Sequence, residues 1–181
     1  MQARSPAPFR VRGLVLLELL VAGCVLALLV ALAVPGFAAM ADRWKVGSAV
    51  DLLTSSLYSA RAEAFRRGGR ITLAQSEPRD CASGTGSSRW SCGWAAFVDE
   101  NGNGRRDGPD ELLFTAQPPL GLQIIQTSKL GALKFDAWGE LAGLGALSFR
   151  VCSRTATSTI SISAGGRIRA AAGNAADLQK C

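Results

Sequence analysis

The chain has 181 residues, with 20 lysines and arginines against 14 aspartates and glutamates, a formal charge of +6, and no histidine. The lack of histidine excludes histidine-based general acid-base catalysis, and no serine or cysteine stands in a nucleophile motif, so the sequence predicts a protein that is not an enzyme. After the apolar N-terminal region and its extension, about 110 residues remain, which is enough for one small domain.

Residues 14–34 form an apolar run in which Glu18 is the only charged side chain. At about 1.5 Å per residue, a helix over this run is about 31 Å long, which matches the hydrocarbon core of a bilayer. An isolated carboxylate there is unfavourable by roughly 2.5 to 3.5 kcal/mol, so Glu18 needs a partner. If the chain is cut after Gly13, the new amino group of Leu14 on a neighbouring subunit supplies one.

A basic leader, Gly13, four apolar residues, Glu18 and a long apolar run follow one another in an order that resembles the class III signal of type IV pilins and type II secretion pseudopilins. The resemblance implies a leader over residues 1–13, a transmembrane assembly helix over 14–34, cleavage after Gly13 by a prepilin peptidase and methylation of the Leu14 amine. It also implies a single-pass protein of the bacterial inner membrane with a periplasmic C-terminal domain. Its partners would be other pilins and an inner-membrane assembly platform.

Three other interpretations of this segment stay open. A secretory signal could end near residues 39–41, although the apolar run is long for a signal and carries a charge. Residues 20–24, Leu-Val-Ala-Gly-Cys, resemble a lipoprotein cleavage site that would anchor the chain at Cys24, although residues 25–34 are still apolar. A plain single-span anchor explains the length of the run but not Glu18.

Residues 35–69 are amphipathic and extend the first helix. Apolar side chains recur at spacings of three and four, as on one stripe of a helix: Val46, Val50, Leu53, Leu57, Ala60 and Ala64. Arg66 and Arg67 suit the C-terminal end of the helix dipole, and Gly68-Gly69 ends the helix. The sequence thus predicts one helix over 14–67, bent or locally melted at Pro35-Gly36.

Short β-prone runs alternate with Gly, Pro, Asn and Asp from residue 70 to residue 181. The expected strands cover 70–75, 91–98, 112–116, 121–126, 132–136, 147–152, 158–164 and 166–170. Together with the helix they predict an α+β, pilin-like fold, in which a long N-terminal helix packs on a twisted antiparallel β domain. Six aromatic side chains are expected in the core and rim of this domain rather than in a ligand platform: Trp90, Trp94, Phe97, Phe135, Trp138 and Phe149.

Four cysteines lie outside the apolar run, and an even number suits disulfide formation in an oxidising periplasm. Of the three connectivities, the sequence favours Cys81 with Cys92, across a short Gly/Ser-rich loop, and Cys152 with Cys181, which ties the C-terminus to a strand. A zinc site is the alternative, but the chain has no histidine and no Cys-x-x-Cys pair.

Residues 99–110 have the donor spacing of a calcium-binding loop. The expected ligands are the side chains of Asp99, Asn101, Asn103, Asp107 and Asp110 and the carbonyl of Arg105. Two adjacent arginines oppose a bound cation, and Asp110 is shorter than the usual bidentate glutamate. The alternative is a polar hairpin loop in which the Asn-Gly pairs form tight turns.

Basic residues collect near the C-terminus, where Arg150, Arg154, Arg167, Arg169 and Lys180 stand against Asp177 alone, a net charge of +4. Strand alternation would turn Ile168 inward and Arg167 and Arg169 outward, about 6.6 to 7 Å apart, comparable with the phosphate spacing along one DNA strand. Such a surface supports salt-dependent, sequence-independent contact with double-stranded DNA. The alternative is an exposed strand whose charges deter edge pairing.

The Gly-Arg-x-Arg pattern at 166–169 resembles the FimT/GspH branch of minor pilins, in some of which it binds DNA during transformation. Further matches are residues 59–64 on the helix, residues 94–98 before the Asp/Asn/Gly loop, and Phe135-Asp136 before Gly139. The resemblance implies a minor pilin or pseudopilin of a type IV pilus or a type II secretion system, with DNA contact in DNA uptake. The alternatives are a pseudopilus subunit that acts only in protein secretion, and a membrane-anchored periplasmic lipoprotein or binding module.

Overall fold

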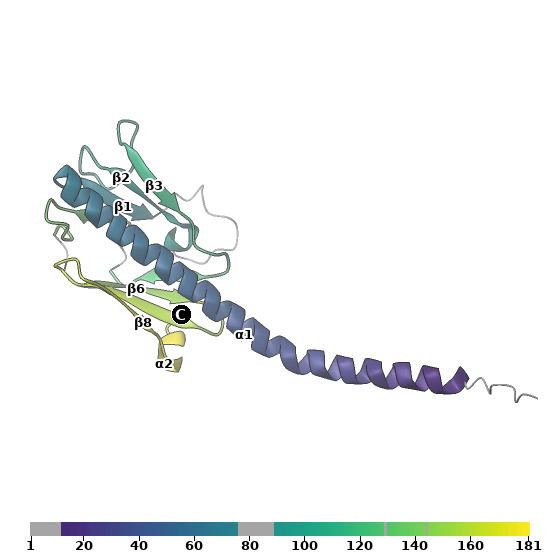
Figure 1. Cartoon of the computed structure of the whole chain (residues 1–181). Coiled ribbons are helices and arrows are strands. Elements are labelled where there is room, and N and C mark those ends of the chain that lie inside the picture. The colour runs from purple at the N-terminus through teal and green to yellow at the C-terminus, as the bar shows by residue number, and fades with distance from the viewer. Residues whose placement is uncertain (1–11, 76–88, 129, 144) are drawn as a thin grey trace, which may run out of the picture. The chain divides into compact units, whose positions relative to one another are not determined.

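The computed structural model describes residues 12–75, 89–128, 130–143 and 145–181. The chain divides into two compact units, Met1–Ala39 (unit 1) and Met40–Cys181 (unit 2). Helix α1, Arg12–Arg67, contributes its first half to unit 1 and its second half to unit 2 (Figure 1).

In unit 1, α1 exposes its large apolar side chains on every side, including Val15, Leu20, Leu26 and Leu32. Within the described part of the chain, α1 is the one helix that is long and apolar enough to cross a membrane. A helix that is apolar all round is typical of a segment surrounded by lipid or by sister helices.

The helix continues through Pro35 and Gly36, so the local melting that the sequence allowed there is not found. A proline removes one donor from the backbone ladder, and the hydrogen bonds on either side of that position remain available to hold the helix together.

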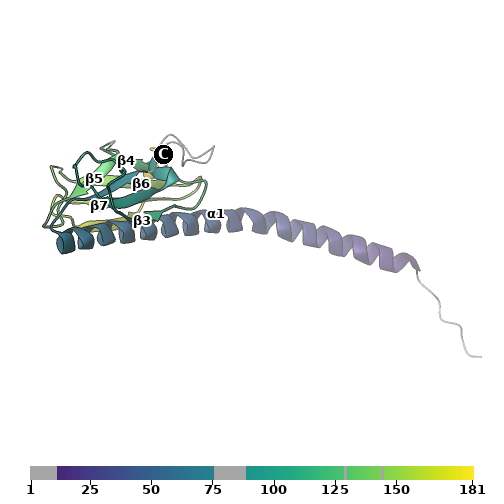
Figure 2. The same ribbon diagram turned by 90° about the horizontal axis from the view of Figure 1, so that it is seen from above.

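The second half of α1 buries the stripe predicted from the sequence. Leu53, Leu57, Ala60 and Ala64 are fully buried, and Val46 and Val50 are buried as well. The helix ends where Gly69 donates its backbone N–H to the carbonyl of Ala64 at 2.8 Å, a bond typical of helix C-termini that close on glycine. Figure 2 shows that the strands of unit 2 lie on one side of the helix.

Two antiparallel sheets of four strands each pack against this stripe. The first has the order β3-β2-β1-β5 and consists of β1 (Ile71–Gln75), β2 (Trp94–Val98), β3 (Leu112–Ala116) and β5 (Ala132–Phe135). The second has the order β4-β6-β7-β8 and consists of β4 (Gln123–Gln126), β6 (Leu147–Cys152), β7 (Thr157–Ile162) and β8 (Ile168–Ala172). The predicted α+β architecture is therefore confirmed, with every expected strand present.

Two elements differ from the sequence prediction. The run expected as a strand over 91–98 begins instead as a 3-10 turn, Arg89–Cys92, and the strand starts at Trp94. The cause is Gly93, which has φ +115°; a Cβ atom there would lie 2.4 Å from the carbonyl oxygen of Ala116. A short helix, α2 (Ala175–Leu178), was not predicted, and Asn174 and Asp177 form its capping box.

Five of the six aromatic side chains named above are buried, as predicted, and Trp90 packs edge-on against Phe149 with ring centres 4.9 Å apart. Trp138 is the exception, since 74% of its surface is exposed.

The predicted Cys152–Cys181 disulfide is present, with 6.1 Å between the two Cα atoms. Cys81 lies outside the described residues, so its pairing with Cys92 stays a prediction.

Candidate functional site

The predicted arginine pair lies on the hairpin that joins β7 to β8. Ser163 and Arg167 close this hairpin through the Ser163 N–H to Arg167 carbonyl bond of 2.9 Å, and the Ser163 hydroxyl accepts a bond from the Arg167 N–H. Ile168 is buried, whereas Arg167 and Arg169 are exposed. Arg167 immediately precedes β8 and Arg169 lies within it, and the two are exposed on either side of a buried isoleucine, as the alternation predicted.

Arg61 of α1 forms hydrogen bonds to the turn of this hairpin. Its Nη1 donates to the carbonyl of Gly166 at 2.6 Å and its Nη2 to the carbonyl of Gly165 at 3.3 Å. Gly166 has φ +72°, and a Cβ atom there would lie 2.7 Å from the carbonyl oxygen of Gly139 and 2.9 Å from Nη1 of Arg61. Only glycine fits this position without a shift of backbone.

The turn at residues 136–140 meets Arg61 and the hairpin at the same place. A Cβ atom at Gly139 would lie 2.7 Å from Cγ of Arg61 and 2.7 Å from Cε2 of Phe65. The Arg61 guanidinium carbon also lies 5.6 Å from the centre of the Phe65 ring, a cation-π distance. Three of the four sequence segments that resemble the FimT/GspH branch thus converge on one junction, which we call the Arg61 junction: Arg61, Phe65, Gly139, Gly165 and Gly166.

The sequence patterns of those segments do not indicate that the segments touch. Arg61 was missed as a site residue because it lies 105 residues before Gly166 in the chain. The signal available was the buried stripe itself, since Arg61 follows Ala60 directly and therefore lies at the edge of the face that packs on the sheets.

The other three predicted basic residues have partners within the protein. Arg154 lies 4.0 Å from the carboxylate of Asp42, and Lys180 lies 3.9 Å from that of Asp177. Arg150 is partly buried in β6, where its Nη1 donates to the carbonyl of Lys180 at 3.3 Å. By contrast, Arg167 and Arg169 form no ion pair among the residues that the structure describes, which leaves two of the five free for an anionic ligand.

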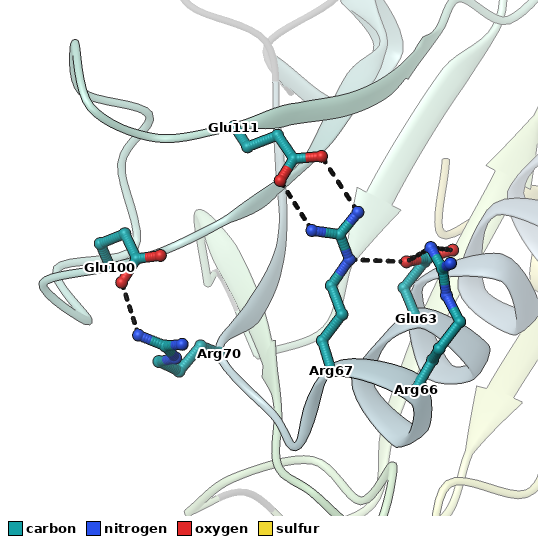
Figure 3. Close-up of polar contacts among 6 residues, drawn as sticks. All are labelled: Glu63, Arg66, Arg67, Arg70, Glu100 and Glu111. Atoms are coloured by element: carbon teal, nitrogen blue, oxygen red, sulfur yellow. Dashed lines mark hydrogen bonds and ion pairs between the residues drawn. The ribbon is translucent and has the colours of Figure 1, made fainter.

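Basic residues at the end of α1 are also neutralised, as Figure 3 shows. Arg67 lies between Glu63, at 2.9 Å, and Glu111, at 2.7 Å, while Arg66 bonds Glu63 at 2.6 Å. The hydrogen bonds from Arg66 and Arg67 hold the pKa of Glu63 below its usual value, and Arg67 does the same to the pKa of Glu111. Glu111, followed by Glu63, raises the pKa of Arg67.

A further pair of opposite charge joins the helix exit to the polar loop. Arg70 bonds Glu100 at 2.5 Å (Figure 3). Arg66, Arg67 and Arg70 are therefore neutralised by glutamates, unlike the two arginines of the β7–β8 hairpin. Each of these exposed ion pairs contributes little to stability by itself.

The loop at residues 99–110 is held by hydrogen bonds to its own carboxylates. The buried carboxylate of Asp99 accepts bonds from the Thr72 hydroxyl at 2.9 Å and from the N–H groups of Asn103 and Gly104. Asp110 accepts from the N–H groups of Glu100 and Asp107. Arg105 donates its N–H to the side-chain oxygen of Asn103 at 2.7 Å.

Asp107 accepts bonds from the amide nitrogens of Asn101 and Asn103, which lower its pKa. Calcium would require both amides to turn their oxygens toward the ion. Within the described residues, no group of three or more acidic, histidine or cysteine side chains converges on one point. Calcium binding in this loop stays a prediction.

In unit 1, the backbone of Gly13 and Leu14 belongs to the first turn of α1, and Glu18 is exposed among apolar neighbours. The described residues of unit 1 therefore place a carboxylate on the surface that a membrane or a sister helix would cover, but they include no cation beside it.

Comparison with known proteins identifies the family. Residues 49–166 match the family model of the type II transport protein GspH, which is more than half of the chain. A search of curated protein sequences gave no match.

Two crystal forms of the type IV minor pilin FimU of Pseudomonas aeruginosa have a similar fold, each at 22% identity over 71% of this chain. The first match covers 92% of the FimU chain with a TM-score of 0.56, and the second covers 97% with a TM-score of 0.53. Those crystal structures share the pilin fold predicted from the sequence. The chain belongs to the GspH family of type II transport proteins and has the fold of a type IV minor pilin.

Proposed function

We propose that this chain is a filament subunit that is inserted in the inner membrane, cleaved after Gly13 and assembled through the first half of α1. The observation that carries the proposal is Glu18, which is exposed in unit 1 and is the only charged residue in the run 14–34. The family and the fold support this role, since both are those of structural subunits rather than of enzymes.

The chemistry of assembly follows from charge matching. In the membrane, an ionised Glu18 is unfavourable by roughly 2.5 to 3.5 kcal/mol on insertion scales. The methylated amine of Leu14 on an adjoining subunit carries the opposite charge, and it appears only after the leader has been removed. Processing by the prepilin peptidase therefore creates the partner that lets the helices associate.

Glu18→Gln tests this proposal. We expect normal insertion into the membrane and cleavage after Gly13, because the apolar run is intact, but a loss of the subunit from sheared filaments. Asp51→Asn, which removes an exposed carboxylate from the second half of the same helix, is the matched control. Equal incorporation of the Glu18 variant and the wild type would contradict the assembly role.

We also propose a second function, contact with double-stranded DNA through Arg167 and Arg169. It is supported by the exposure of both side chains and by their lack of ion pairs within the described residues. A pair of phosphate contacts supplies affinity without reading the base sequence. This function favours a type IV pilus that takes part in DNA uptake, and its absence favours a pseudopilus subunit that acts only in protein secretion.

Arg167→Gln with Arg169→Gln tests the DNA contact in the full chain in detergent micelles. We expect weaker duplex binding and a salt dependence that is flatter by about 1.8 in the log-log slope, because two phosphate contacts are lost. Arg105→Gln with Arg106→Gln is the matched control, since these two adjacent arginines are also exposed. Unchanged binding by the first variant would contradict the DNA contact.

A further inference from the structure

Trp138 is presented to solvent on an ordered turn. The residue is 74% exposed, whereas Trp90 and Trp94 are almost fully buried. The carboxylate of Asp136 accepts bonds of 2.9 Å from the N–H groups of both Trp138 and Glu140, and the Asp136 carbonyl accepts one from Gly139. Hydrogen bonds within the turn thus hold a large apolar ring in water, where a ligand can reach it.

The turn brings Trp138 next to the arginine hairpin. The Gly139 carbonyl oxygen would lie 2.7 Å from a Cβ at Gly166, so these two backbones touch. Trp138 and Arg167 are each one residue, about 3.8 Å along the chain, from that contact. Phe65, which is 54% exposed, contacts the same turn at Gly139.

We call this area the Trp138 surface and define it by Phe65, Trp138, Arg167 and Arg169. Exposed aromatic rings beside cations are the composition of surfaces that bind single-stranded nucleic acid, where rings stack on bases and cations contact the backbone. In a duplex the faces of internal bases are covered by their neighbours, so only unpaired or terminal bases can stack on a protein ring.

Glu140 adds a negative charge beside the hairpin, since its Oε1 would lie 3.8 Å from a Cβ at Gly165. This charge weakens the attraction that two arginines alone exert on a phosphate chain. Stacking of a base on Trp138 would add affinity that this charge does not oppose.

We propose that the Trp138 surface binds single-stranded DNA, with Trp138 stacked on an unpaired base and Arg167 and Arg169 on the adjacent phosphates. This proposal rests on the proposed DNA contact of the arginine pair and adds a preference for unpaired strands. The duplex contact uses the arginines alone.

The test compares a single-stranded oligonucleotide with a closed circular duplex, which has no terminal bases, in binding to the full chain in detergent micelles. Trp138→Ala is expected to weaken binding of the single strand by about tenfold, which is the loss of one stacked base. Its duplex binding should stay within about twofold of the wild type. Trp138→Tyr keeps an aromatic ring and should restore most of the single-strand affinity.

Trp44→Ala is the matched control, because Trp44 is a second exposed tryptophan of unit 2, at 72%. It should change neither affinity. A stacked base should also quench the fluorescence of Trp138 in a Trp44→Phe background, whereas a duplex should not.

The outcomes separate this proposal from the function on which it rests. If the arginine double variant loses both forms of DNA while Trp138→Ala loses neither, the duplex contact stands and the stacking site is overturned. If the arginine variant and the wild type bind DNA equally, the proposed DNA function fails first. If Trp138→Ala blocks incorporation into filaments and leaves DNA binding intact, the ring belongs to a subunit contact and the proposal is also overturned.

Discussion

At the scale of single residues, Arg61 links parts of the chain that the sequence keeps far apart. Its two bonds to the carbonyls of Gly165 and Gly166 fix the hairpin, and its stem fills the space that the missing side chain of Gly139 leaves. The orientation of Arg167 depends on this support, because Arg167 follows Gly166 directly. Arg61 is therefore a positioning residue for the proposed DNA contact, and it does not need to touch DNA.

We predict that Arg61→Gln lowers the free energy of unfolding of unit 2 by about 1 to 2 kcal/mol, since it removes charge-assisted bonds to two carbonyls. Thermal unfolding of the full chain measures this loss. Hydrogen exchange of the Gly166 amide, which bonds the Ser163 carbonyl, should become faster.

A comparison with Arg61→Lys separates position from charge. Lysine keeps the positive charge but reaches only one carbonyl at a time. It should therefore restore only part of the DNA binding that Arg61→Gln loses when the hairpin is no longer held in place. Identical stability and identical exchange in all three proteins would show that the Arg61 junction does not hold the hairpin.

At the scale of elements, the sequence predicted most of the secondary structure because its patterns are strong. The stripe from Val46 to Ala64 repeats at helical spacing, and the strand residues Ile160 and Ile162 alternate with polar neighbours that remain less buried. The start of β2 was misplaced because backbone contact at Gly93, not side-chain pattern, decides it. The exposure of Trp138 was missed because it is set by the Asp136 turn.

The contacts between elements were beyond reach of the sequence pattern. The Arg61 junction joins positions more than 100 residues apart, and periodicity reports only on neighbours along the chain. The same limit explains the C-terminal charge. Counting found five basic residues. Within the described residues, Arg154 pairs with Asp42, Lys180 pairs with Asp177 and Arg150 donates to a backbone carbonyl, so two of the five form no ion pair or side-chain hydrogen bond.

The loop at 99–110 makes a prediction at this scale. Hydrogen bonds from Asn101 and Asn103 lower the pKa of Asp107 in the folded chain. These bonds therefore stabilise the loop fully at a pH above the pKa of an unfolded aspartate, and this stabilisation is lost as the pH falls through the lower pKa of the folded chain. The NMR shift of the Asn103 side-chain amide should titrate with a midpoint below about 3.9, the value of a free aspartate. Asn101→Ala should raise the midpoint, and a wild-type midpoint at or above the free value would contradict the prediction.

The same titration tests the calcium site. A bound cation favours the ionised carboxylates, so calcium should move the midpoint to lower pH in the wild type and have less effect in Asp99→Asn. If calcium leaves the midpoint unchanged, the loop does not bind calcium and is held by its hydrogen bonds alone.

At the scale of the whole molecule, the last residues of the chain are fixed to β6 of unit 2. The Cys152–Cys181 disulfide joins the end of β6 to the C-terminus across 29 residues, and the Lys180 carbonyl accepts a bond from Arg150. The last strand, β8, is an edge strand of the second sheet, and the segment that follows it is joined to β7 where the Gly173 N–H donates to the Thr157 carbonyl at 2.9 Å. The disulfide therefore secures the tail and keeps Arg150 engaged.

We predict that Cys152→Ser with Cys181→Ser lowers the free energy of unfolding of unit 2 by about 3 to 4 kcal/mol, the chain entropy of a loop of this length. Denaturant unfolding of the full chain in micelles measures it. Cys24→Ser is the matched control, because Cys24 is an exposed free cysteine of unit 1 and should leave the transition of unit 2 unchanged. Release of the tail also frees Arg150, so the double variant should bind duplex DNA somewhat more tightly and with a steeper salt dependence. If the double cysteine variant unfolds at the same denaturant concentration as the wild type, other contacts hold the C-terminal tail, and the disulfide does not stabilise the domain.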